Sequence, residues 1–116
     1  MCIRDSTTNA NRDDLKSELR KEEGGLSGDP LHQISTNMIK KFYKELNNKI
    51  PIIGVGGVNS GKSAYEKIIA GASLLQLYTG FVYRGPSVAK DIKKELIQIL
   101  KAEGIKNIKD AVGKGI

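Results

Sequence analysis

Several residue types are scarce in this 116-residue chain, and each scarcity disfavours a class of protein. The single cysteine, Cys2, cannot form an internal disulfide, which disfavours a disulfide-stapled secreted domain and fits a reducing compartment. There is no tryptophan and there are two phenylalanines, so aromatic platforms for stacking nucleic-acid bases are few. The one histidine, His32, and the scattered acids form no metal-ligand cluster. No apolar run approaches the roughly 20 residues needed to cross a bilayer.

The net charge of +6 raises the question of a nucleic-acid partner. The lysines, however, are spread over helical segments near residues 40–44 and 90–101, where they alternate with acids such as Glu45 and Asp91. A nucleic-acid footprint would be a tighter basic stripe, whereas mixed charges are typical of a solvated helix surface. We therefore expect no nucleic-acid partner and no metal. We interpret His32 as a surface residue at a helix start, with no partner.

The apolar pattern predicts an α/β chain. Residues 1–28 carry almost no periodic pattern, and a loop of that length is usually functional or disordered. After it, helical spacing alternates with runs typical of buried parallel strands. The expected order is helix, strand, helix, strand, helix, over residues 31–46, 50–55, 61–70, 74–78 and 87–102, with a short terminal helix over 107–112. Ser35 or Thr36 is expected to cap the first helix, and Ser60 the second.

The two strands end in corners that predict an anion site. The first, IPIIGVGGVN (50–59), runs into a glycine turn, and the second, LLQLYTG (74–80), ends in hydroxyl groups. Glycine lets backbone N–H groups approach an anion closely, and the helix N-terminus after Ser60 would favour negative charge. Such corners on adjacent parallel strands are typical of the phosphate pocket of a (β/α) barrel. Two strands alone leave unpaired edges, so we expect this chain to be a piece of something larger.

Three segments together are specific enough to indicate a family. GGLSGDPL (24–31), IPIIGVGGVNSGKSAYEKIIAGASLLQLYTG (50–80) and GPSVAKDIKKEL (85–96) closely resemble the C-terminal part of quinone-linked (class 2) dihydroorotate dehydrogenase. IGVGGV alone would be weak, because many phosphate-binding barrels carry something similar. The resemblance implies the C-terminal portion, about strands 7–8 and helices 6–8, of a TIM (β/α)8 barrel that binds FMN, with the chain beginning just after strand six.

The resemblance also implies roles for individual residues. Gly28 resembles the glycine whose backbone approaches the flavin, and Gly57 the one whose N–H meets the FMN phosphate. Tyr78 and Thr79 resemble the pair that completes the phosphate grip. Thr7 matches a threonine that holds orotate or dihydroorotate. Plain turn or strand-end roles stay open for each of them.

The N-terminal end departs from the family. Ser6 stands where the family has an asparagine that binds the pyrimidine, and MCIRDS (1–6) resembles no part of the family. We expect residues 1–6 to be a non-native leader that overwrote natural residues, and residues 7–116 to be the family segment. The resemblance places the catalytic serine base upstream, so no residue here is expected to be catalytic. Ser27, Ser60 and Ser63 have sufficient explanations as turn or cap residues.

The implied activity is oxidation of dihydroorotate to orotate with a quinone as electron acceptor, in de novo pyrimidine (UMP) biosynthesis. The full-length protein would associate peripherally with a membrane, at the cytoplasmic face of the inner membrane if bacterial. The isolated chain is expected to be inactive and to supply the FMN-phosphate site. Two alternatives stay open, a piece of another FMN- or phosphate-binding (β/α)8 oxidoreductase and a stand-alone, non-enzymatic basic binding module.

Overall fold

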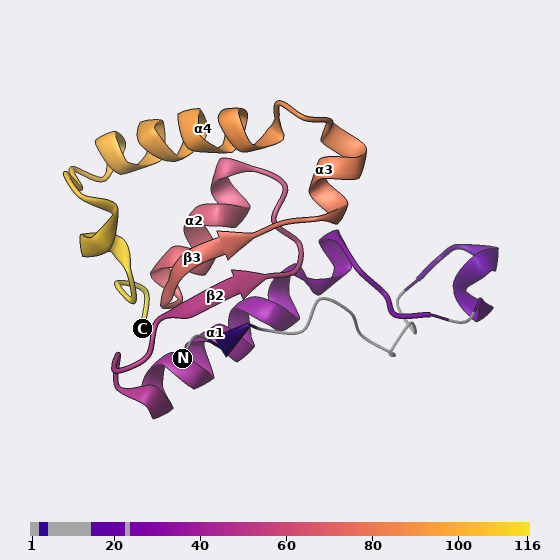
Figure 1. The fold of residues 1–116 in the computed structure, drawn as a ribbon, viewed down its shortest axis with the longest axis horizontal. Helices are drawn as coiled ribbons and strands as arrows, with labels where there is room; N and C mark the ends of the chain where they lie inside the picture. Colours follow the sequence, from indigo (N-terminus) through magenta and orange to yellow (C-terminus); the bar gives the residue numbers. More distant parts are fainter. Residues whose placement is uncertain (1–2, 5–14, 23) are drawn as a thin grey trace.

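The computed structural model describes residues 3–4, 15–22 and 24–116 (Figure 1). A parallel sheet with strand order β1-β2-β3 lies at its centre. The strands are β1 (Ile3–Arg4), β2 (Ile52–Val55) and β3 (Ala72–Gln76). The helices are α1 (His32–Leu46), α2 (Gly61–Ile69), α3 (Thr79–Arg84) and α4 (Val88–Ala102), with short 3-10 turns η1 (Glu18–Lys21), η2 (Asp29–Leu31) and η3 (Ile108–Ala111).

The sheet confirms the expected α/β class and the parallel β-α-β unit, but not the number of strands. Ile53 of β2 pairs with Leu74 of β3, and Ile52 pairs with Ile3 of β1. The prediction of two strands was therefore wrong, because a third, two-residue strand lies on the other side of β2. Two residues are too few to carry the alternation by which a strand is read from a sequence.

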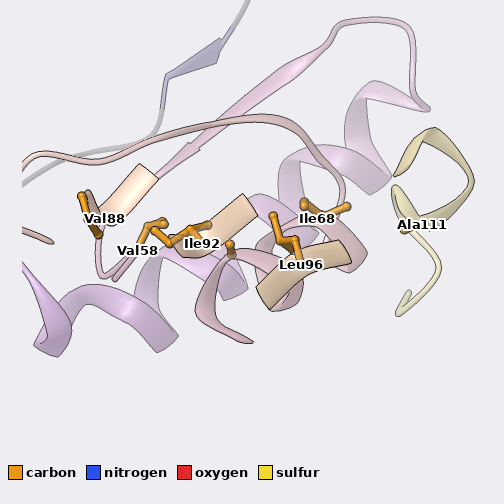
Figure 2. Packing of buried hydrophobic residues seen from close by; sticks show 7 residues of the cluster. Val58, Ile68, Val88, Ile92, Leu96 and Ala111 are labelled. Atoms are coloured by element: carbon orange, nitrogen blue, oxygen red, sulfur yellow. The ribbon is translucent and has the colours of Figure 1, made fainter. Parts of the chain in front are cut away.

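Two helices pack on the sheet, α1 against β2 and α2 against β3 (Figure 1). The long helix α4 packs on α2. The main core forms where α2 and α4 meet. Its buried residues are Val58, Ala64, Ile68, Val88, Ile92, Leu96 and Ala111 (Figure 2). A second cluster lies between α1 and the sheet and contains Ile39, Ile52, Ala70 and Ala72. In the main core, the four-residue spacing of the buried side chains within α2 and within α4 places them on one face of each helix.

The helix ends confirm one predicted cap and correct another. Ser60 caps α2 in a capping box with Ser63, as expected of an N-cap serine. α1 begins at His32, within one residue of the predicted start at residue 31, and η2 with Pro30 leads directly into it. Ser35 and Thr36 are therefore buried inside α1 and do not cap it.

The corner after β3 also differs from the expected strand. β3 ends at Gln76, and the residues expected to end a strand near Tyr78 instead lead into the six-residue helix α3. Several apolar side chains stay exposed, among them Leu74 of β3 and Phe81 and Val82 of α3. None of the helices in the described part of the chain combines the length and the apolarity that crossing a bilayer requires.

Candidate functional site

A cavity of about 440 Å³ opens at the C-terminal edge of the sheet. Three segments line it: residues 27–30 before α1, residues 55–59 at and after the end of β2, and residues 77–80, 83 and 84 before and in α3. The carboxyl ends of parallel strands meet at one edge of a sheet, and ligands of α/β proteins bind there. The cavity therefore lies where the two predicted corners come together.

The glycine turn after β2 has a backbone that only glycine adopts easily. Gly56 has φ 97° and Gly57 has φ 69°. A Cβ on Gly57 would lie 2.6 Å from the Cα of His32, and a Cβ on Gly56 would lie 3.3 Å from the Cβ of Ser35. The turn thus packs directly against the first residues of α1, with no room for a side chain between them.

Gly28 and Thr79, two residues singled out from the sequence, contact each other across the cavity. A Cβ on Gly28 would lie 2.9 Å from the Cγ2 of Thr79. The Thr79 hydroxyl donates to the Ser27 Oγ at 3.1 Å. Gly28 has φ 84° and ψ −149°, a region open essentially to glycine alone. The loop before α1 and the start of α3 are therefore in close contact.

Gly80 joins the two strand corners, a role that the sequence interpretation missed. A Cβ on Gly80 would lie 2.5 Å from the carbonyl oxygen of Val58. The sequence signal was present, since a glycine follows Thr79 in LYTG, but it was interpreted only as the end of a strand. Tyr78, which precedes α3, lines the same cavity with a largely exposed side chain.

Two N–H groups at the N-terminus of α2 bond to side chains of the chain itself. The Glu95 carboxylate accepts from the Gly61 N–H, and the Ser63 N–H donates to the Ser60 Oγ at 3.2 Å. A carboxylate at this position also compensates the positive end of the helix dipole. The negative charge that this helix start was expected to favour is thus supplied within the chain by Glu95.

Asn59 links the three loops around the cavity. Its side-chain amide donates to the Asp29 Oδ1 at 2.9 Å, and its carbonyl oxygen accepts from the Arg84 guanidinium. Arg84 also lies 3.9 Å from the Glu95 carboxylate. Hydrogen bonds and one ion pair thus connect the segments at the cavity rim. Neither Asn59 nor Arg84 was singled out from the sequence.

The titratable side chains of His32 and Tyr65 lie among other side chains of the protein. His32 was expected to lack a partner, and that expectation was wrong, because its Nε2 bonds to the Glu66 Oε2. Burial raises the pKa of Tyr65, and the nearby Glu103 carboxylate adds to that rise. Within the residues that the structure describes, no group of three His, Cys, Asp or Glu side chains could hold a metal ion.

Four of the five residues predicted for the site line this one cavity, namely Gly28, Gly57, Tyr78 and Thr79. Thr7, predicted to hold the substrate, lies outside the described residues. The site is therefore a glycine-walled pocket at the carboxyl edge of a parallel α/β sheet, which is the class of site that binds phosphate groups of cofactors or substrates.

Comparison with known proteins gives the family. The model of the dihydroorotate dehydrogenase family matches residues 1–100. The mitochondrial quinone-type dihydroorotate dehydrogenase of Arabidopsis thaliana is 50% identical over 110 residues, which are 93% of this chain and 24% of that protein. The corresponding Mus musculus protein is 52% identical over 99 residues, which are 85% of this chain and 25% of that protein. This chain belongs to the dihydroorotate dehydrogenase family.

Solved structures agree with this assignment. The ligand-free type DHODH of Eimeria tenella superposes with a TM-score of 0.89 at 45% identity, covering 94% of this chain and 30% of that one. The Eimeria tenella DHODH in complex with ferulenol gives 0.91 at 44% identity, covering 96% and 30%. The resemblance to the quinone-linked enzymes is confirmed. The chain spans about a quarter to a third of the length of these relatives.

Proposed function

We propose that this chain forms the FMN-phosphate side of the active site in a quinone-linked dihydroorotate dehydrogenase. The observation that carries the proposal is the convergence of Gly28, Gly57 and Thr79 on one cavity at the carboxyl edge of the sheet. The relatives named above are quinone-type dihydroorotate dehydrogenases, so the whole protein is proposed to oxidise dihydroorotate to orotate in pyrimidine (UMP) biosynthesis.

The residues present fit a bound phosphate group. The backbone at Gly56 and Gly57 has positive φ and carries no side chain that would cover its N–H groups. The Thr79 hydroxyl stands at the rim with Tyr78 beside it. The Tyr78 hydroxyl can donate to a phosphate oxygen, and the Thr79 hydroxyl can do so when Ser27 donates to it instead of accepting from it. When bound, FMN would supply the redox step by accepting a hydride and passing its electrons to the quinone. The chain's own share is to bind and orient the cofactor.

The finer assignment to strands seven and eight and helices six to eight of a TIM (β/α)8 barrel is part of the proposal. β2 and β3 would then be strands seven and eight, and their parallel pairing as neighbours in the sheet is consistent with that assignment. Residues 1–6 are proposed to be a non-native replacement of natural residues. The gene or transcript sequence upstream of Thr7 tests this, because a frame that continues into further β-α units with a serine base is expected there.

Thr7 is proposed to hold dihydroorotate or orotate, and the catalytic serine is proposed to lie in the preceding part of the parent protein. Quinone binding and peripheral membrane association are proposed for that preceding part as well. None of these roles requires a metal or a nucleic acid.

The full-length protein tests the function directly. The purified protein is expected to carry stoichiometric FMN, measured by absorbance after release, and to reduce a soluble quinone in the presence of dihydroorotate. A protein that binds no flavin would contradict the proposed site. A protein that binds FMN but oxidises another substrate would favour a different FMN-binding barrel enzyme.

A further inference from the structure

Lys67 is a charged side chain inside the protein. It is fully buried, with 0% of its surface exposed, on the face of α2 that also carries Ala64 and Ile68. Lysine is almost never fully buried unless its ammonium group is held by polar partners, because removing the charge from water is costly. The polar partners of the buried Lys67 ammonium group therefore show what this side chain does.

The ammonium group of Lys67 is bound by the first turn of α1. Its Nζ donates to the Ser35 Oγ at 2.8 Å, to the Thr36 Oγ1 at 3.2 Å and to the His32 carbonyl oxygen at 3.4 Å. Beside it, the Glu66 carboxylate bonds to the His32 ring. Glu66 and Lys67, which are consecutive in α2, thus both bind the first turn of α1. The backbone of that turn lies close to Gly57.

Ser35 connects Lys67 to β2 by hydrogen bonds. A serine hydroxyl has one proton to donate, and the Ser35 hydroxyl donates it to the Val55 carbonyl oxygen while its oxygen accepts from Lys67. A hydrogen bond from a cation polarises the hydroxyl and strengthens the bond that the hydroxyl donates in turn. The chain of contacts runs from the ammonium group through one hydroxyl to the last residue of β2.

The carbonyl of Val55 belongs to the same planar peptide group as the N–H of Gly56. Fixing the direction of the carbonyl oxygen therefore fixes the direction of that N–H, which points the opposite way in a trans peptide. Ser35 also packs on Gly56, whose Cβ, if present, would lie 3.3 Å from the Ser35 Cβ. The orientation of the first N–H of the glycine turn is thus tied to Lys67.

We propose that Lys67 is a positioning residue for anion binding, acting through Ser35 on the peptide between Val55 and Gly56. The inference rests on the proposed function, because it takes the ligand of this turn to be the phosphate of FMN. If Lys67 has this role, its loss should weaken the binding of the phosphate group and leave the binding of the flavin ring unchanged. If Lys67 only stabilises the fold, its loss should weaken the binding of both.

The test compares FMN with riboflavin, which has the same ring system and no phosphate. The full-length protein is stripped of flavin, and both dissociation constants are measured by fluorescence titration. Lys67→Met keeps an unbranched apolar stem and removes the ammonium group. It is expected to weaken FMN binding about tenfold, the scale of one charge-assisted hydrogen bond, and riboflavin binding by no more than about twofold.

Two hydroxyl variants serve as a matched pair. Ser35→Ala breaks the link to Val55 and is expected to reproduce the loss of FMN preference. Thr36→Val removes the other hydroxyl that Lys67 binds. That hydroxyl donates its own proton within α1, to the His32 carbonyl, so its removal is expected to leave the preference for FMN unchanged. If Lys67→Met does not fold, the comparison of these two variants still tests whether the link from Ser35 to Val55 supports phosphate binding.

Each outcome has a distinct meaning. Equal losses for FMN and riboflavin in Lys67→Met or Ser35→Ala would overturn the positioning role and leave Lys67 as a structural cross-link. Equal effects of Ser35→Ala and Thr36→Val would overturn the route through Val55. If the unaltered protein binds FMN no more tightly than riboflavin, the proposed phosphate site itself fails, whatever Lys67 does.

Discussion

Gly57 lies directly against His32, at the point where the turn after β2 meets the start of α1. A Cβ on Gly57 would lie 2.6 Å from both the Cα and the Cβ of His32 and 2.7 Å from its backbone nitrogen. Two of these three atoms belong to the backbone, and α1 is held at this turn by Glu66 and Lys67. Helix and turn therefore cannot separate by a simple side-chain movement, and the geometry of the anion turn depends on this contact.

We predict that Gly57→Ala in the full-length protein abolishes stoichiometric FMN binding. The added methyl group must displace the turn or α1, and φ 69° is itself unfavourable for alanine. We expect a loss of FMN affinity of at least about tenfold and a loss of stability of about 1–3 kcal/mol. Flavin content after gel filtration and a thermal melt measure the two effects.

Gly104→Ala is the matched control for this substitution. Gly104 ends α4 with φ 67°, and no atom lies within 4 Å of its Cβ position. It therefore carries the same backbone strain without the steric contact, and FMN content is expected to stay stoichiometric. An equal loss of flavin in both variants would show that the contact with His32 is not what matters.

A second prediction concerns the contact between Gly28 and Thr79. Gly28→Ala is expected to weaken FMN binding, because its Cβ would lie 2.9 Å from the Thr79 Cγ2. Adding Thr79→Ser removes that methyl group and keeps the hydroxyl, so the double variant is expected to recover part of the affinity. Titration of the flavin-free protein with FMN measures both constants.

Gly85→Ala is the control for Gly28→Ala. Gly85 has φ 79° and ψ −175°, close to the conformation of Gly28, and its Cβ position has open space around it. It is expected to cost stability without loss of FMN affinity. If the double variant binds FMN no better than Gly28→Ala alone, the steric explanation is wrong and backbone strain is sufficient.

The sequence predicted the residues of the site better than the contacts between them. Glycines at a strand end and a serine before a helix have local causes, so the turn at Gly57 and the Ser60 cap could be predicted, whereas Gly28 was assigned from the family resemblance. The Glu95 carboxylate reaches the N-terminus of α2 from α4, and no local pattern encodes that contact. Lys67 did leave a signal, because it lies three residues after Ala64 on the inner face of α2. Its charge obscured that signal, since lysines are usually taken to face solvent.

The Glu95 cap gives a third prediction. Glu95→Gln removes the negative charge at the N-terminus of α2, and we expect stability to fall by about 0.5–1 kcal/mol. FMN affinity should stay within about twofold, because the turn after β2 and not the start of α2 is proposed to bind the phosphate. Chemical denaturation and FMN titration measure these two quantities.

The exposed Glu45 near the end of α1 provides the comparison, since Glu45→Gln removes the same charge away from any helix N-terminus. Little change in stability or FMN affinity is expected there. A clear rise in FMN affinity for Glu95→Gln alone would mean that the phosphate competes with this carboxylate for the start of α2, contrary to the proposed site.

The last prediction concerns the isolated 116-residue chain. Leu74 and Val82 are 62% and 65% exposed, and the outer edges of β1 and β3 are unpaired within the described sheet. Exposed apolar groups and open strand edges favour association with other chains. We therefore expect the isolated chain to self-associate and to show no cooperative, flavin-independent melting, as measured by light scattering after gel filtration and by calorimetry.

Co-expression with the preceding part of the parent protein is the informative comparison, because that part would cover the same surfaces if the barrel assignment holds. A soluble complex of the two parts that retains FMN is expected. A monodisperse monomer of the isolated chain that unfolds cooperatively without flavin would contradict the barrel assignment. It would favour a stand-alone binding module, since a folded unit of this kind would not depend on missing strands to bury Leu74 and Val82.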